Sequence, residues 1–264
     1  MPLLLIFFLW AECLCLSAAP SSSHSFSEFE PAGGGCYVFQ RRGEPLSFGF
    51  AMRKFKPLPK SFYEPSAKIV APLLLGHWLI RNTSAGPCGG AIVETEAYLS
   101  DDPACHGAPG PTPRNRVMFG APGHGYVYLI YGYHFCVNAV CRPTGVAEAV
   151  LIRALEPVFG ESLMQQSRSV AKPRDLTSGP AKLCEAMRID RALDGIELCD
   201  PTSALFIAEN AEVEEFRRAR RPLVTTTRIG ITRAAAMPLR FYLGGSPFVS
   251  RRAVLRLKKT AVKN

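Results

Sequence analysis

The chain has 264 residues, 47% of them hydrophobic, which is enough to bury one substantial core, and we expect a single domain. Its formal net charge of +9 and isoelectric point near 9.2 favour a polyanionic partner, either a nucleic acid or an anionic membrane surface. The nine cysteines form no Cys-x-x-Cys pair and no zinc-binding spacing with histidine. The sequence therefore predicts buried reduced thiols, with no metal site and no disulfide framework.

Residues 1–51 do not resemble the rest of the chain. The first 20 residues hold an apolar run and then small residues, which is typical of a secretory signal, although Glu12 interrupts it and a basic start is missing. The run is too short for a spanning helix. The chain turns basic only near Met52, a sensible start codon, so this segment is either a targeting sequence or upstream sequence translated in error. In both interpretations we expect it to be disordered and outside the fold.

The first elements of the predicted domain are a helix and a strand. Apolar residues at helical spacing predict a helix over residues 65–76, with Pro72 as a kink. Residues 77–81 follow as a strand, and residues 82–84 predict a turn that matches a glycosylation sequon. The sequon would matter only in a secreted chain.

A strand is predicted over residues 91–99, and its alternation places Glu94, Glu96 and Tyr98 on one face. An edge strand with a solvated polar face would show the same pattern. The loop that follows, residues 100–116, adds His106 and the segment TPRNR. Its two cations and small polar groups suit phosphate contacts.

Residues 125–138 predict two aromatic strands that meet at a turn supplied by Gly132. Tyr126 and Tyr128 share a face, and Tyr131 lies at or near the tip. Tyrosines in strands are usually cross-strand packing. A tip tyrosine flanked by basic loops can instead be a wedge that fills the gap left by a displaced nucleotide in a duplex.

The remaining elements include two candidate ligand groups. Residues 150–155 predict a buried strand around Arg153, which pairs either with a core carboxylate or with a site. Residues 178–184 predict a turn into a helix whose amides and Lys182 suit an anion. We also expect a helix over residues 161–168, a solvated helix or loop over 209–221, and closing strands at 228–231 and 239–242.

Together these elements predict an α+β fold: a single domain with a curved, mainly antiparallel β-sheet, flanking helices and a protruding β-hairpin. The domain is expected over residues 52–250, and the basic tail, residues 251–264, is expected to fray.

Nine segments in order resemble the alkyladenine (3-methyladenine) DNA glycosylase family over about residues 60–250. They are VETEAY, the His106 loop, TPRNR, MFG, PGHGYVYLIYG, VLIRALEP, SGPAKLC, RIGI and RFYLGGSP. The resemblance implies a monofunctional enzyme that flips alkylated or deaminated purines out of double-stranded DNA and hydrolyses their N-glycosidic bond in base excision repair. The implied substrates are 3-methyladenine, 7-methylguanine and hypoxanthine. It also implies a monomer without cofactor or metal.

The resemblance also implies a role for individual residues. Glu96 activates the attacking water, and Arg153 holds that water or Glu96, while Glu94 only supports them. Tyr131 intercalates into DNA. The damaged base is held by Tyr98, His106, Tyr128 and Asn138, of which Asn138 crowds the exocyclic amine of guanine. The DNA backbone is contacted by Thr112, Arg114, Arg116, Met118 and Lys182.

Two other interpretations remain open. One is a damaged-DNA-binding protein on the same fold with impaired catalysis, against which Glu96 and Arg153 argue. The other is a secreted basic protein, motivated by residues 1–20. The glycosylase interpretation implies an intracellular, DNA-associated protein in a nucleus, an organelle or a bacterial cytoplasm.

Overall fold

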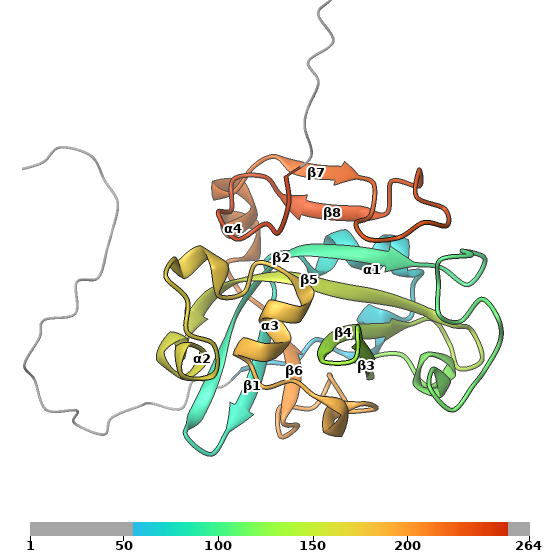
Figure 1. Cartoon of the computed structure of the whole chain (residues 1–264), viewed down its shortest axis with the longest axis horizontal. Helices are drawn as coiled ribbons and strands as arrows, with labels where there is room; N and C mark the ends of the chain where they lie inside the picture. The colour runs from blue at the N-terminus through green and yellow to red at the C-terminus, as the bar shows by residue number, and fades with distance from the viewer. Residues whose placement is uncertain (1–54, 253–264) are drawn as a thin grey trace, which may run out of the picture. The chain divides into compact units, whose positions relative to one another are not determined.

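The computed structural model describes residues 55–252 (Figure 1). The expected N-terminal extension lies outside these residues, as does the basic tail from residue 253. The α-helices are α1 (Ala67–Leu74), α2 (Glu161–Ser167), α3 (Pro180–Ala186) and α4 (Val213–Ala219). The strands are β1 (Trp78–Thr83), β2 (Gly86–Tyr98), β3 (Gly125–Ile130), β4 (His134–Cys141), β5 (Glu148–Phe159), β6 (Leu205–Ala208), β7 (Leu223–Thr226) and β8 (Arg240–Leu243). Short 3-10 helices occur at Lys60–Tyr63, Arg116–Phe119, Pro173–Asp175 and Arg191–Leu193.

The strands form one antiparallel sheet in the order β3-β4-β5-β2-β1-β6, and β8 pairs with both β2 and β7. Helix α1 packs against β2 and β5, while α3 packs against β4 and β5. In Figure 1, α3 lies in front of the sheet and α2 lies to its left. The predicted α+β single domain with a mainly antiparallel sheet is confirmed.

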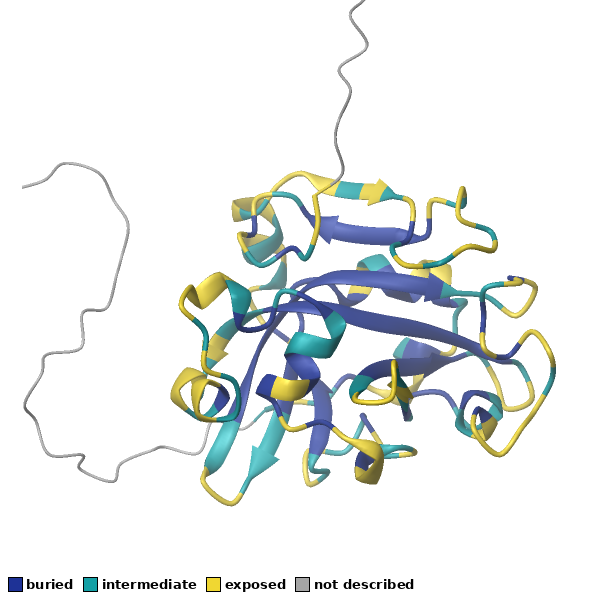
Figure 2. Ribbon diagram, in the orientation of Figure 1, coloured by how far each residue is buried: buried dark blue, intermediate teal, exposed yellow. Residues whose placement is uncertain are grey.

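Strand β2 is the centre of the sheet. One edge pairs with β5, and the other pairs first with β1 and then, from Glu94 to Glu96, with β8. The side chains on both faces of β2 are buried over most of its length (Figure 2), because neighbouring strands flank the strand and helices pack on the sheet. At Gly89 and Gly90 a side chain would meet a neighbouring backbone carbonyl oxygen at 2.2 Å, so only glycine allows this close strand packing.

The edge-strand interpretation of the Glu-x-Glu pattern is wrong. Glu94 and Glu96 are both fully buried in the central strand, and Thr95 between them bonds through its hydroxyl to the Ala71 carbonyl oxygen of α1. The two carboxylates thus face away from α1. Buried carboxylates need cationic or hydrogen-bonding partners, which points to the opposite face of the sheet as the functional one.

The predicted aromatic hairpin is formed by β3 and β4, which pair from Gly125–Ala139 to Ile130–His134. Three residues remain for the turn, where Tyr131 and Gly132 have positive φ angles of 54° and 81°. The turn leaves Tyr131 74% exposed and Tyr133 72% exposed. The hairpin therefore ends in two solvent-facing aromatic rings.

Two local predictions need correction, two strands were not predicted, and the open choice between helix and loop at residues 209–221 is resolved. The turn between β1 and β2 consists of Ser84 and Ala85, because β1 continues through Thr83. Residues 228–231 form a loop, since Gly230 has a φ of +77° that a strand does not allow. Strands β6 and β7 were not predicted. The structure also resolves residues 209–221 into helix α4 with flanking loop.

No helix in the described part of the chain is long and apolar enough to cross a membrane. The six cysteines within residues 55–252 are free thiols, and five of them are buried.

Candidate active site

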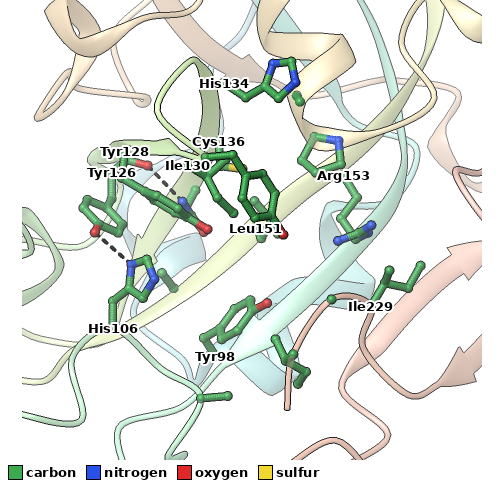
Figure 3. A pocket seen from close by; sticks show the side chains of 18 of the residues that line it. Tyr98, His106, Tyr126, Tyr128, Ile130, His134, Cys136, Leu151, Arg153 and Ile229 are labelled. Carbon is green, nitrogen blue, oxygen red and sulfur yellow. Dashed lines mark hydrogen bonds between the residues drawn. The ribbon is translucent and has the colours of Figure 1, made fainter. Parts of the chain in front are cut away.

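A cavity of about 300 Å³ opens on the face of the sheet that carries Glu96 (Figure 3). Most of its wall is apolar or aromatic, as is common for sites that bind flat organic ligands. Strands β2, β3, β4 and β5 contribute to it, together with the start of α3 and the loop after β7. Its lining includes Tyr98, His106, Met118, Tyr126, Tyr128, Ile130, Tyr131, His134, Cys136, Asn138, Leu151, Arg153, Ile229, Gly230 and Ile231.

Strand register explains why these residues meet. Tyr126 pairs with Asn138, Asn138 with Leu151, Leu151 with Glu96, and Glu96 with Arg240. Directly paired residues of neighbouring strands point to the same face of a sheet. One row across five strands therefore provides the pocket floor and its carboxylate.

Glu96 lies beneath this pocket and is 0% exposed. Its Oε1 atom accepts a hydrogen bond from the Ile229 backbone N–H at 2.8 Å and lies 3.2 Å from Arg153 Nη1. Its Oε2 atom accepts a hydrogen bond from the Tyr98 hydroxyl at 3.0 Å. All three donor residues line the cavity, so the carboxylate is held at its wall.

Arg153 links the two buried carboxylates. Its Nε atom donates to Glu94 Oε1 at 3.1 Å, while Nη1 contacts Glu96. Burial alone lowers the pKa of the Arg153 guanidinium, but Glu96 and Glu94 outweigh it and raise that pKa above its usual value. The arginine thus stays charged. The two alternatives for Arg153 both hold, because it pairs with two buried carboxylates and also lines the pocket.

Glu94 is enclosed more tightly than Glu96. Besides Arg153, its oxygens accept from Arg240 Nε at 2.7 Å and from the Ser250 backbone N–H and hydroxyl at 2.7 and 2.9 Å. Glu94, Ser250 and Glu96 itself are not among the lining residues, but every donor to Glu96 lines the cavity, whereas of the donors to Glu94 only Arg153 does. This network positions Arg153 from behind and leaves Glu96 as the carboxylate next to the pocket.

An aromatic wall stands on the hairpin side of the pocket (Figure 3). The rings of Tyr126 and Tyr128 stack at 5.3 Å between centroids, and His106 meets Tyr128 edge-on at 4.5 Å. His106 Nδ1 and the Tyr126 hydroxyl are 3.0 Å apart and share a hydrogen bond. Tyr126 was missed as a site residue, although its alternation with Tyr128 was a usable signal.

Burial governs the protonation of these rings. It raises the pKa of Tyr126 to about 12 and raises that of Tyr128 further, so both phenols stay protonated. Burial, assisted by the Arg114 charge, lowers the pKa of His106. Burial and then Glu96 raise the pKa of Tyr98, which keeps it a donor to Glu96. These tyrosine and histidine side chains are therefore neutral at physiological pH, and Arg153 is the charged side chain beside them.

The predicted strand at residues 228–231 proves to be a pocket loop. Its Ile229 N–H binds Glu96 instead of a neighbouring strand, and Ile229, Gly230 and Ile231 all line the cavity. No local pattern in the sequence could have revealed this, because the bond joins residues 133 positions apart.

The predicted backbone-contact residues have different surroundings. Thr112 and Arg114 border a second cavity of about 480 Å³ next to His106. Asn115, between Arg114 and Arg116, is buried and donates to the His106 carbonyl oxygen at 2.7 Å, so it holds the loop in place. Arg114 and Arg116 are exposed beside it, and Arg114 Nη2 donates to the Leu129 carbonyl oxygen of the hairpin at 3.0 Å.

The other two predicted backbone-contact residues, Met118 and Lys182, are less exposed than Thr112, Arg114 and Arg116. Met118 is 2% exposed and belongs to the pocket wall, so its side chain does not face outward. Lys182 is partly exposed and follows Pro180 and Ala181, which line the pocket, while its amine lies 3.6 Å from Asp175. Within residues 55–252 no cluster of His, Cys, Asp and Glu could hold a metal ion.

Comparison with known proteins identifies the protein family of this chain. The sequence profile of the methylpurine-DNA glycosylase family matches residues 61–247. The chain belongs to the methylpurine-DNA glycosylase family. A relative from Methanoculleus marisnigri, named as a candidate 3-methyladenine DNA glycosylase, is 50% identical over 195 residues, which are 74% of this chain and 99% of the relative.

Two further relatives carry the same name. The protein of Carboxydothermus hydrogenoformans is 46% identical over 74% of this chain and 99% of its own length. That of Koribacter versatilis is 42% identical over 78% of this chain and 98% of its own length. As a member of the methylpurine-DNA glycosylase family, the chain is a DNA-binding hydrolase of N-glycosyl bonds that acts in base excision repair.

Proposed function

We propose that this methylpurine-DNA glycosylase is monofunctional and excises 3-methyladenine, 7-methylguanine and hypoxanthine after flipping the damaged nucleotide out of the duplex. The observation that carries this proposal is the Glu96 carboxylate, held by Arg153 at the wall of a pocket with aromatic sides. The names of the relatives support 3-methyladenine as one substrate.

Flipping follows from the burial of Glu96. A base stacked in duplex DNA cannot reach a carboxylate that is 0% exposed, so the nucleotide must leave the stack at a cost of a few kcal/mol. Tyr131, which lines the pocket mouth and is 74% exposed at the hairpin tip, fills the gap left behind. Arg114, Arg116, Thr112 and Lys182 contact the backbone phosphates.

The flipped purine stacks in the pocket against Tyr98, Tyr128 and His106. Stacking on an aromatic ring stabilises a bound base by about 1–3 kcal/mol, and a positively charged alkylpurine gains a further cation–π contribution. The side-chain amide of Asn138 is fixed by a hydrogen bond that its Nδ2 atom donates to the Tyr126 carbonyl oxygen at 3.0 Å. In that position it crowds the exocyclic amine at C2 of guanine, which disfavours guanine bases, including 7-methylguanine, relative to 3-methyladenine and hypoxanthine, which have no amine at C2.

Glu96 takes a proton from a water molecule whose oxygen forms the new bond to the sugar C1′. The N-glycosidic bond breaks, and its electron pair leaves with the purine. The sugar resembles an oxocarbenium ion in the transition state, which the nearby carboxylate stabilises. A purine alkylated at N3 or N7 carries a positive charge and therefore leaves as a neutral base.

The reaction ends at an abasic site. A glycosylase that also cuts the strand needs an amine to attack C1′, and no lysine lines the pocket in the described part of the chain. The protein acts as a monomer on double-stranded DNA.

The decisive experiment incubates the purified protein with a duplex that contains one hypoxanthine and treats half of each sample with alkali. We expect strand breaks only after alkali, which reveals abasic sites. Tight binding without abasic product would support the impaired damaged-DNA-binding protein instead. Breaks without alkali would contradict the monofunctional mechanism.

A further inference from the structure

Arg228 lies behind Tyr98, outside the pocket. Its side chain is fully buried, and its Cζ atom lies 4.6 Å from the centre of the Tyr98 ring. Tyr98 lines the cavity and Arg228 does not, although the next three residues of its loop do. A purine that stacks on Tyr98 from the pocket therefore has this guanidinium on the other side of the ring.

The hydrogen-bond donors of Arg228 are only partly satisfied. Nη1 donates to the Ala97 carbonyl oxygen at 2.9 Å and forms an ion pair with the buried Asp102. Nε and Nη2 are buried and have no hydrogen-bond partner among residues 55–252. Two N–H groups of the guanidinium thus lack an acceptor. They lie in a buried region of low dielectric, where charges interact over longer distances than in water.

A cation on one face of an aromatic ring changes what the other face binds. The negative faces of a tyrosine ring attract cations, but a guanidinium already on one face draws that electron density toward itself. It also repels a second positive charge across the ring. A neutral purine loses little from this arrangement, whereas a cationic purine loses part of its cation–π attraction.

We infer that Arg228 is a specificity-determining residue that lowers the preference of the pocket for cationic alkylpurines and so retains neutral deaminated purines as substrates. This inference rests on the proposed function, because it concerns the ratio between two of the proposed substrates. Arg228 acts through Tyr98 and touches neither the substrate nor the water.

The test compares single-turnover excision rates for 7-methylguanine, which is cationic in DNA, and hypoxanthine, which is neutral. We expect Arg228→Met to raise the ratio of the two rates by on the order of fivefold. Arg228→Lys, which keeps the charge, should stay within about twofold of the wild-type ratio.

Arg228→Met leaves the Asp102 carboxylate buried and unpaired, which can prevent folding. The double variant Arg228→Met/Asp102→Asn removes both charges and keeps an oxygen for the Ala104 N–H, which now donates to Asp102 Oδ1 at 2.9 Å. It should show the same raised ratio. Melting temperatures identify which variants are folded.

Arg220→Met is the matched control, because Arg220 also covers an aromatic ring, Phe216, at 3.8 Å and pairs with a carboxylate, Glu156. Neither residue lines the pocket, so the wild-type ratio should persist. An unchanged ratio in the folded double variant, or an equal rise in Arg220→Met, would overturn the inference. Wild-type protein that excises neither base would instead refute the proposed function.

Discussion

Two carboxylates on one strand face have different surroundings. Glu94 accepts hydrogen bonds from Arg153, Arg240 and Ser250, of which only Arg153 lines the pocket. Glu96 is bound only by residues that themselves line the pocket. Alternation along β2 gives both residues the same position on the strand face, so their neighbours alone distinguish the proposed base, Glu96, from the supporting Glu94.

Glu96→Gln should keep the shape of the site and abolish proton abstraction. We expect the excision rate of hypoxanthine to fall by at least about 100-fold, while affinity for the same duplex changes little. Single-turnover kinetics and a binding titration on one protein preparation measure both. Turnover near the wild-type rate would show that another group activates the water.

Glu94→Gln should act mainly on stability. Its loss of charge leaves Arg153 and Arg240 buried with one carboxylate fewer, and we expect the free energy of unfolding to fall by about 3 kcal/mol. Denaturant unfolding measures the change. Glu214→Gln, at an exposed ion pair with Arg217, is the control that should hardly alter stability. An equal effect of both variants would contradict the proposed positioning network.

At the scale of elements, the β3–β4 hairpin provides one wall of the pocket and carries the exposed tip that we propose as a wedge. Tyr126 and Tyr128 in β3 build the pocket side, and the turn exposes Tyr131 and Tyr133. A two-stranded ribbon alone is barely stable, but here β4 continues into the sheet through β5. The tip is thus carried on a fixed support, which a residue that enters a duplex requires.

Tyr131→Ala should slow excision from duplex DNA by about tenfold, because the gap left by the flipped nucleotide loses its aromatic filling. Excision from single-stranded DNA should change little, since no gap exists there. Rate measurements on both substrates test this difference. Tyr133→Ala is the matched control, with 72% exposure at the same tip and no place in the pocket. Equal losses in the two variants would argue against a specific wedge at Tyr131.

At the scale of the whole molecule, a buried histidine links the two ends of the domain. His77, between α1 and β1, is 7% exposed, and its Nδ1 atom accepts a hydrogen bond from the Asn210 N–H at 3.2 Å. Burial, assisted by the Arg217 charge, lowers the pKa of His77 to about 4 from its usual value of 6.5. The folded state therefore keeps His77 neutral where the unfolded chain protonates it.

This shift predicts a loss of stability in acid. Between pH 6.5 and about 4 the unfolded chain binds a proton that the folded chain rejects, so the free energy of unfolding falls as the pH decreases. The slope due to His77 is on the order of 1 kcal/mol per pH unit. His77→Asn should be less stable at neutral pH but should lose less on acidification. Parallel slopes for the two proteins would show that His77 does not contribute.

Local patterns in the sequence indicated several residues of the candidate site. Alternation put Glu96 and Tyr98 on one strand face, and Gly132 marked the turn that exposes Tyr131. Motif order supplied the family, which the profile match confirms. These features depend on the spacing of residues over short stretches of chain, which can be read from the sequence without the tertiary structure.

Only the tertiary structure decided which strands pair and in what register. That register puts Tyr126, Asn138, Leu151 and Glu96 in one row, although they come from four strands. It also turned the predicted strand at residues 228–231 into the loop that binds Glu96 and places Arg228 behind Tyr98. The physical reason is that a buried carboxylate and a buried cation must find partners in space, and those partners are distant in the chain.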